Sequence, residues 1–303
     1  MYKIIKNSKY WFILSGSLMV LSIVAIAVFG LRLGIDYKGG TAIEAHSSNP
    51  NKVDITERIV REQFSSGYQV KAGGNDQINL RLPVLSNEEH AKLSSSLTDA
   101  LGGDYKESLY DSVGPTISKD LTNKSILSVI LASIAIILYI AYAFRKIPKP
   151  LSSWKFGLSA VIALIHDLLI TTGIVALIAH FVTWMEVDAL FVTALLTIMG
   201  FSVHDTIVVY DRLRENFIKN PHKGIMMTAE ESVNQTLARS INTSLTVIIV
   251  LISLFVLGGA SIRHFVLILI IGILFGTYSS IFVATAILVK WQQKKIPSAA
   301  TAK

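Results

Sequence analysis

The chain has 303 residues, of which 51% are hydrophobic and only 16% are charged. Ordinary soluble domains are about 25% charged, so this composition excludes a typical soluble enzyme and predicts a membrane protein. The net charge of +7 does not indicate nucleic acid as a partner, because the cations form short clusters beside apolar runs. Cysteine is absent, which excludes disulfides and thiolate chemistry, and we predict no metal site.

The first apolar run follows Lys3, Lys6 and Lys9 and continues from Trp11 to Phe29. A cleaved secretory signal is the alternative, because Ala25–Ala27 loosely resembles a signal-peptidase site. The run of about 19 residues is longer than the ~7 to 15 apolar residues of a signal sequence. We therefore interpret residues 1–30 as the first transmembrane helix.

The next segment, residues 31–122, is polar, with 10 Lys or Arg and 13 Asp or Glu residues. Alternating patterns predict strands at 41–46, 68–71, 77–82 and 105–112. Helical spacing predicts helices over 52–65 and after Ser86, where Ser86 and Glu89 form a capping box. The order β-α-β-β-α-β predicts one ferredoxin-like α+β domain.

Five further apolar runs follow within residues 123–290. Each is long enough to cross a membrane at about 20 residues per crossing, and they lie near 124–144, 156–180, 188–210, 240–258 and 264–289. With the first run, they predict a polytopic membrane protein of six transmembrane helices. The clustered cations lie on one side of it: Lys3, Lys6, Lys9, Arg145, Lys146, Lys149, Lys155, Arg212, Arg214, Lys219, Lys223, Lys290, Lys294 and Lys295. By the positive-inside rule both termini are cytoplasmic, 31–122 is extracytoplasmic, and 291–303 is a cytoplasmic tail.

Ionisable residues within the predicted spans are the main candidates for function, because each costs about 2.5 to 3.5 kcal/mol on insertion scales. Asp205 lies six residues before Asp211, or ~9 Å of helix from the charged edge. Arg239 opens the fifth span from the same side. We expect these two side chains to form an ion pair. Asn242, Thr243 and Thr246 should extend a polar stripe from Arg239 into the bundle.

Two interpretations of this pair remain open. In the first, Asp205 binds and releases a proton, and Arg239 sets its proton affinity by its distance. In the second, the pair is a static link between two helices, with Arg239 extending to the membrane surface.

Three other groups of residues have more than one interpretation. Asp167 is placed to bond Thr171 at i+4, to bond another helix, or to share the proton path, whereas His166 fits a packing role. Ser202, His204 and Asp205 together suggest a serine protease, but their spacing does not place them on one helical face. The small residues Gly272, Gly276 and Ser280 predict close helix packing.

A glycine-rich segment follows the first span, with Gly34, Asp36, Gly39 and Gly40. Glycines favour a tight exit into the first strand, and Asp36 can bond backbone groups freed by that turn. A mobile junction is the alternative interpretation. The sequence has no phosphate-binding Gly-x-x-x-x-Gly-Lys-Ser/Thr loop, so we predict no bound ATP and no other cofactor.

Five blocks together resemble the SecD/SecF family, in its SecF branch. They are GIDYKGG at 34–40, VGPTI at 113–117, the run 195–216 with DTIVVYDR at 205–212, RSINTS at 239–244 and GTYSS at 276–280. The sequence departs from the family pattern at His204, where Asn is usual, at Tyr37, where Phe is common, and at Ser118, where Gly is more usual.

The resemblance implies a member of the resistance-nodulation-division superfamily in the bacterial cytoplasmic (inner) membrane. It implies pairing with SecD in a twelve-helix bundle, association with the SecYEG channel, and contact with translocating unfolded polypeptide and the lipid bilayer. It also implies that proton flow, rather than a cofactor, drives export, with Asp205 and Arg239 at the conducting positions and a further conducting aspartate in SecD. His204 could then alter the pH dependence of Asp205.

Two rival functions remain. The chain could be half of a different transporter of the same superfamily, although one outer domain of about 90 residues argues against a complete efflux pump. It could also be a non-conducting scaffold that stabilises the secretion channel. In a scaffold, charge-conserving replacements of Asp205 and Arg239 would be tolerated.

Overall fold

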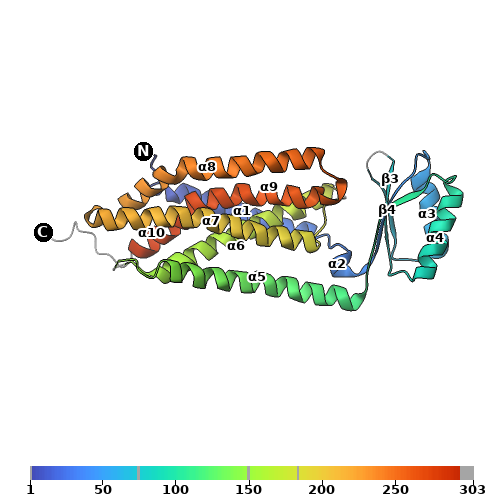
Figure 1. Cartoon of the computed structure of the whole chain (residues 1–303), viewed down its shortest axis with the longest axis horizontal. Helices are drawn as coiled ribbons and strands as arrows, with labels where there is room; N and C mark the ends of the chain where they lie inside the picture. Colours follow the sequence, from blue (N-terminus) through green and yellow to red (C-terminus); the bar gives the residue numbers. More distant parts are fainter. Residues whose placement is uncertain (1, 74–75, 149–150, 183, 294–303) are drawn as a thin grey trace. The chain divides into compact units, whose positions relative to one another are not determined.

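The computed structural model describes residues 2–73, 76–148, 151–182 and 184–293 (Figure 1). Contacts divide the chain into two units, one formed by Leu33–Ile126 and the other by the residues on either side of it. Most of the segment 291–303 that the sequence predicts to be a tail lies outside the described residues.

Six helices in the described residues are long and apolar enough to cross a membrane, as the sequence predicts. They are α1 (Ser8–Phe29), α5 (Pro115–Ala143), α6 (Ser153–Phe181), α7 (Ala189–Lys219), α8 (Ile225–Leu257) and a last helix over Arg263–Gln293. Short 3₁₀ turns, η1 (Pro221–Lys223) and η2 (Ala260–Ile262), lie on either side of α8. The last helix consists of α9 (Arg263–Ser279), a π-helical turn η3 (Ser280–Ala284) and α10 (Thr285–Gln293).

Three of these helices form the centre of the bundle. In the apolar stretch of each helix, the buried share of residues is 56% for α6, 50% for α7 and 61% for the last helix. The buried share is only 17% for α1, 11% for α5 and 17% for α8. Small residues allow close approach: Gly272 of α9 lies against Ile198 of α7, and Gly276 lies against Ser202. The predicted packing role of these two glycines is therefore confirmed.

The second unit contains a four-stranded antiparallel sheet with the order β2-β3-β1-β4. Its strands are β1 (Gly40–His46), β2 (Gln69–Ala72), β3 (Gln77–Leu82) and β4 (Lys106–Val113), and its helices are α3 (Lys52–Gln63) and α4 (Asn87–Ala100). Both helices cover one face of the sheet (Figure 1). Val60, Leu93 and Leu97 pack there against Ile43 and Ile78. This is the ferredoxin-like arrangement that the sequence predicts.

The glycine-rich segment is not a simple extended exit. It contains a short helix, α2 (Ile35–Lys38), with Gly34 before it and Asp36 in its first turn. Gly39 and Gly40 follow with φ of 74° and 125°. A Cβ atom on Gly40 would lie 2.8 Å from the carbonyl oxygen of Leu82, so only glycine fits there.

The capping box at α4 supports a first prediction. The Ser86 hydroxyl accepts from the Glu89 N–H at 3.2 Å, and the Glu89 carboxylate accepts from the Ser86 N–H at 2.8 Å. We expect Ser86→Ala to destabilise α4 by about 1 kcal/mol, measured as faster hydrogen exchange of α4 amides at neutral pH. Ser95→Ala is the matched control, because Ser95 is exposed and bonds only the Lys92 carbonyl within the helix.

The stability of α4 should also depend on pH. The Ser86 backbone N–H holds the pKa of the Glu89 carboxyl below its ordinary value. A carboxyl whose folded-state pKa is lowered contributes stability above its unfolded pKa and loses it as the pH falls through the folded pKa. The protection of α4 amides should therefore fall at acidic pH in wild type and in Ser86→Ala alike, because the Ser86 backbone N–H that bonds the carboxylate remains in the variant. Protection that stays constant to the lowest pH would show that the Glu89 charge plays no part.

Candidate functional site

Asp205 lies on α7 with its side chain turned into the bundle, only 6% exposed. Its Oδ1 accepts a hydrogen bond from the Ser240 hydroxyl of α8. Its Oδ2 is buried, and no hydrogen-bond partner for it exists among the described residues. An unsatisfied buried oxygen is rare, because the desolvation of a polar atom costs about 1 to 3 kcal/mol. Asp205 therefore has one oxygen fixed by a hydrogen bond and one oxygen that is open, in the sense that it has no hydrogen-bond partner in the described residues.

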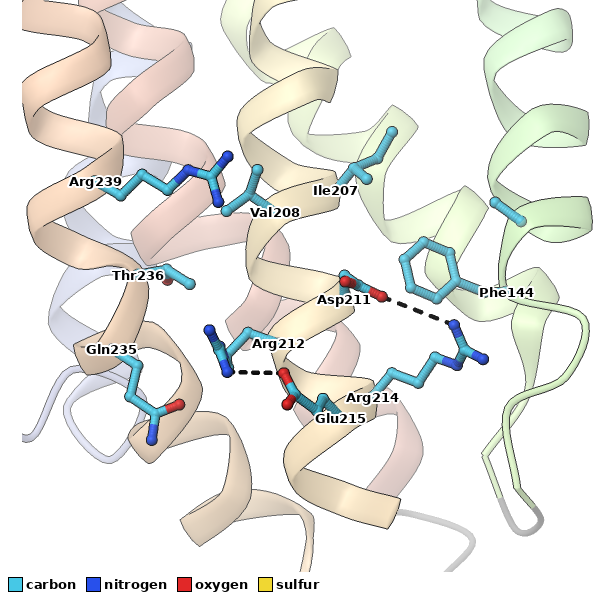
Figure 2. Close-up of a pocket in the computed structure, with 11 residues that line it drawn as sticks. Phe144, Ile207, Val208, Asp211, Arg212, Arg214, Glu215, Gln235, Thr236 and Arg239 are labelled. Atoms are coloured by element: carbon cyan, nitrogen blue, oxygen red, sulfur yellow. Dashed lines mark hydrogen bonds and ion pairs between the residues drawn. The ribbon is translucent and has the colours of Figure 1, made fainter. Parts of the chain in front are cut away.

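The predicted ion pair between Asp205 and Arg239 is wrong for the part of the chain that the structure describes. Adjacent residues on a helix point about 100° apart. Ser240 takes the direction toward Asp205, and Arg239 points from α8 toward Val208 of α7 instead (Figure 2).

Arg239 lines a cavity of about 350 Å³ between α5, α7 and α8 (Figure 2). The lining residues are Ala143, Phe144, Ile207, Val208, Asp211, Arg212, Arg214, Glu215, Gln235, Thr236 and Arg239. Arg212 pairs with Glu215 at 2.7 Å, and Arg214 lies 3.7 Å from Asp211. The cavity is therefore lined by three cations and two anions. Its residues Asp211 and Arg212 lie on α7 between one and two helical turns after Asp205.

The expected polar stripe along α8 is also wrong. Asn242, Thr243 and Thr246 are exposed on the chain. Ser240 and Ser244 face the bundle instead, and the Ser244 hydroxyl bonds that of Thr277 on α9. Residues four apart share a helical face, so the spacing of the two serines could have indicated this face.

Asp167 on α6 is completely buried, with an exposure of 0%. Its Oδ2 accepts hydrogen bonds from Ser202 of α7 and Ser279 of α9, both at 2.7 Å. Its Oδ1 lies 2.9 Å from Nδ1 of His166. The expected bond to Thr171 is absent: the Thr171 hydroxyl is buried and has no hydrogen-bond partner in the described residues. Asp167 thus bonds other helices, which was one of the interpretations that the sequence left open.

The protease interpretation fails on the same contacts. Ser202 donates to Asp167, and the His204 side chain is exposed. No hydrogen-bonded Ser-His-Asp chain links these three residues. No group of three or more His, Asp or Glu side chains placed to hold a metal occurs in the described residues either.

Hydroxyl groups connect the central helices, and among them the sequence singled out Ser280 only as a small packing residue. Thr206 of α7 bonds Ser280 at 2.8 Å, and Ser280 donates to the Ser202 carbonyl at 3.0 Å. Together with Thr277 and Ser279, Ser280 makes the end of α9 the point where bonds from α6, α7 and α8 meet.

Comparison with known proteins identifies the family. The model of "Protein export membrane protein SecD/SecF, C-terminal" matches residues 93–294, and that of the "SecD/SecF GG Motif" matches residues 24–50. The chain belongs to the SecD/SecF family. The range matched by the first model contains Asp167, Asp205 and Arg239, and the range matched by the second contains Gly39 and Gly40.

Relatives within the SecD/SecF family match along nearly the whole chain. The chain is 40% identical to protein translocase subunit SecF of Thermobaculum terrenum, over 97% of this chain and 95% of that one. It is 36% identical to protein translocase subunit SecF of Anaerolinea thermophila, over 96% and 94%. The chain is therefore a multi-pass membrane protein of the SecD/SecF family.

A solved SecD/SecF structure has the same fold. The crystal structure of SecDF, a translocon-associated membrane protein, from Thermus thermophilus matches with a TM-score of 0.82 and 30% identity. The match covers 96% of this chain and 39% of that chain, so this chain spans well under half of the SecDF polypeptide.

Proposed function

We propose that this chain is the SecF subunit of a SecDF complex, which uses proton flow across the membrane to promote protein translocation through the SecYEG channel. The observation that carries this proposal is the buried Asp205 carboxyl, with Oδ1 held by Ser240 and Oδ2 open. A proton adds to the open Oδ2 and converts the carboxylate into a neutral acid. It leaves from the same atom when the environment again favours the charge.

The cavity near Asp205 gives the proton a route to one side of the membrane. It is lined by Arg212 and Arg214, which by the positive-inside rule mark the cytoplasmic side. We assign both termini to the cytoplasm of a bacterium and the α+β domain to the opposite side of its inner membrane. The Arg239 guanidinium in this cavity provides positive charge that acts on Asp205 through space rather than by direct contact.

The partner assignment is supported by the relatives compared above. The chain matches 95% of a protein translocase subunit SecF and 39% of the SecDF polypeptide, so we assign the remainder of that architecture to SecD. Translocating unfolded polypeptide is the proposed load on the α+β domain, and the bilayer surrounds the exposed apolar residues of α1, α5 and α8. One charge crossing 100 mV supplies about 2.3 kcal/mol, enough to bias a conformational equilibrium about fiftyfold.

Arg239 separates this proposal from a non-conducting scaffold. Arg239→Lys keeps the charge but replaces a planar guanidinium with a flexible ammonium, which no longer holds the positive charge at the same distance from Asp205. We expect it to lower proton-dependent export into membrane vesicles about threefold or more. Arg212→Lys is the matched control, because Arg212 lines the same cavity but pairs with Glu215. It should leave export unchanged.

Both variants should copurify with SecD and SecYEG as the wild type does. Full export activity of Arg239→Lys would favour the scaffold. A wild-type chain that copurifies with neither SecD nor SecYEG would contradict the partner assignment and leave half of a different transporter as the better candidate.

A further inference from the structure

The bundle contains a second buried acid, Asp167, which the proposed mechanism does not use. It lies on α6, fully buried, and joins α6 to α7 and α9 through Ser202 and Ser279. A buried carboxylate with three fixed partners is either a permanent structural link or a site that holds a proton in part of the cycle. The geometry of its partners decides between these two roles.

Ser279 has two acceptors for its single hydroxyl hydrogen. Its Oγ lies 2.7 Å from Oδ2 of Asp167 and 3.1 Å from the carbonyl oxygen of Gly276. When Asp167 is ionised, the hydroxyl donates to the carboxylate. When Oδ2 carries a proton, the Oδ2–H group donates a hydrogen bond to the Ser279 oxygen, and the Ser279 hydroxyl donates to the Gly276 carbonyl instead. Both charge states are therefore fully bonded without any movement of the helices.

His166 supplies a second group that can hold a proton. Its Nδ1 faces Oδ1 of Asp167 at 2.9 Å, while its Nε2 is buried and has no partner in the described part of the chain. Its ring stacks on Tyr278 of α9, with ring centres 6.2 Å apart. In the neutral ring with hydrogen on Nδ1, the free Nε2 lone pair can accept a proton.

Few other ionisable groups face this pair. The helices packed against α6 are α1, α7 and the α9 to α10 helix, and α5 approaches it where Gly157 meets Ile137. Between Lys124 and Arg145 the only ionisable side chains of α5 are the exposed Tyr139 and Tyr142. On α7 the ionisable residues next to Ser202 are the exposed His204 and the buried Asp205, and on α9 Tyr278 stacks on His166. The segment Trp11–Phe29 of α1 has no acid or base, and the last helix has none between Tyr278 and Lys290. The pair can therefore change its protonation with little interference from other charges.

We propose that Asp167 and His166 form a second proton-binding site within this chain. The site rests on the proposed proton-driven function and adds to it a second carboxyl on the same subunit. Protonation switches the Ser279 hydroxyl between Asp167 and Gly276, directly before the π-helical turn η3. Turns of this kind interrupt the regular helix and are frequent at functional sites.

The end of α9 also connects this site to Asp205. Thr277, two residues before Ser279, bonds Ser244 of α8. Ser244 donates to the Ser240 carbonyl at 3.0 Å, and the Ser240 hydroxyl bonds Asp205. One turn of α9 is therefore bonded to Asp167 directly and to Asp205 through Ser244 and Ser240 of α8, so a change of charge at either acid acts on the same helix.

Infrared difference spectroscopy of the purified full-length chain, titrated with pH in lipid nanodiscs, tests this site directly. A protonated carboxyl gives a C=O band that disappears on ionisation. We expect the wild type to show two such contributions, one removed by Asp167→Asn and the other by Asp205→Asn. If Asp167→Asn leaves the pH-dependent carboxyl bands of the wild type unchanged, the second site does not exist.

Ser279→Ala tests the same site when Asp167→Asn fails to fold. It removes one hydrogen bond from the acid, so the C=O band of Asp167 should move to higher frequency while that of Asp205 stays in place. Ser253→Ala is the matched control, because Ser253 is exposed on α8 and bonds only the Ile249 carbonyl. An Asp167 band that Ser279→Ala does not move would overturn the proposed switch.

Proton-dependent export separates this inference from the proposed function. Asp167→Asn should lower export about threefold. If Asp205→Asn abolishes proton dependence but no Asp167 band exists, only the second site is wrong. If the Asp167 band exists but export ignores the proton gradient in wild type, the proton-driven function is wrong and the binding site remains.

Discussion

Replacing Asp205 with asparagine should abolish the stimulation of protein export by a proton gradient while the chain stays folded. Asparagine has nearly the same shape, and its amide oxygen can still accept the hydrogen bond from Ser240. It cannot bind and release a proton at the open Oδ2 position. We expect at least a tenfold loss of the proton-dependent part of export in vesicles, with the proton-independent part unchanged.

Asp211→Asn is the matched control for this experiment. Asp211 is an acid on the same helix, but its side chain is 69% exposed and lies 3.7 Å from Arg214. Exposed pairs of this kind contribute about 0 to 1 kcal/mol, so the variant should export normally. Export that still responds to the proton gradient in Asp205→Asn would contradict the assignment of Asp205 as the proton carrier. The six-helix fold does not depend on that outcome.

The crossing segments and the α+β domain were predictable because their signals are local. A run of about 20 apolar residues or an alternating strand pattern identifies an element without knowledge of its neighbours. The helix ends were not predictable in this way. α5 begins at Pro115 and α8 at Ile225, well before the apolar runs at 124 and 240. A helix can continue through charged residues into water, so hydropathy marks the membrane and not the helix.

The buried acids were predictable because an acid in an apolar span is expensive. Their partners were not. The direction of a side chain around α8 is set by its packing on α7 and α9, and it places Ser240 rather than Arg239 against Asp205. The block 276–280 resembles the family, but it gave no signal of the contacts of Ser279 and Thr277, because single hydroxyl residues are common in membrane helices and carry no charge. Only the packed structure shows that they meet at the end of α9.

The contact between α1 and α6 should be the most sensitive packing site of the bundle. A Cβ atom on Gly173 of α6 would lie 2.3 Å from Cβ and 2.5 Å from Cα of Ser22 on α1. Because one of these atoms belongs to the backbone, a rotation of the side chain cannot relieve the clash. Overpacking costs about 1 to 3 kcal/mol, or occasionally more, against a gain of about 1 kcal/mol from replacing glycine in a helix.

We therefore expect Gly173→Ala to destabilise the membrane unit by about 1 kcal/mol, measured by thermal unfolding in detergent. Gly16→Ala is the matched control, since Gly16 lies on α1 with no atom within 4 Å of the added methyl group. It carries the same gain in helix propensity without the clash, so it should raise the melting temperature slightly. A lower melting temperature for Gly173→Ala and a higher one for Gly16→Ala would locate the destabilisation at the α1 to α6 contact. If both variants were equally stable, the two helices would not approach as closely as Gly173 and Ser22 require.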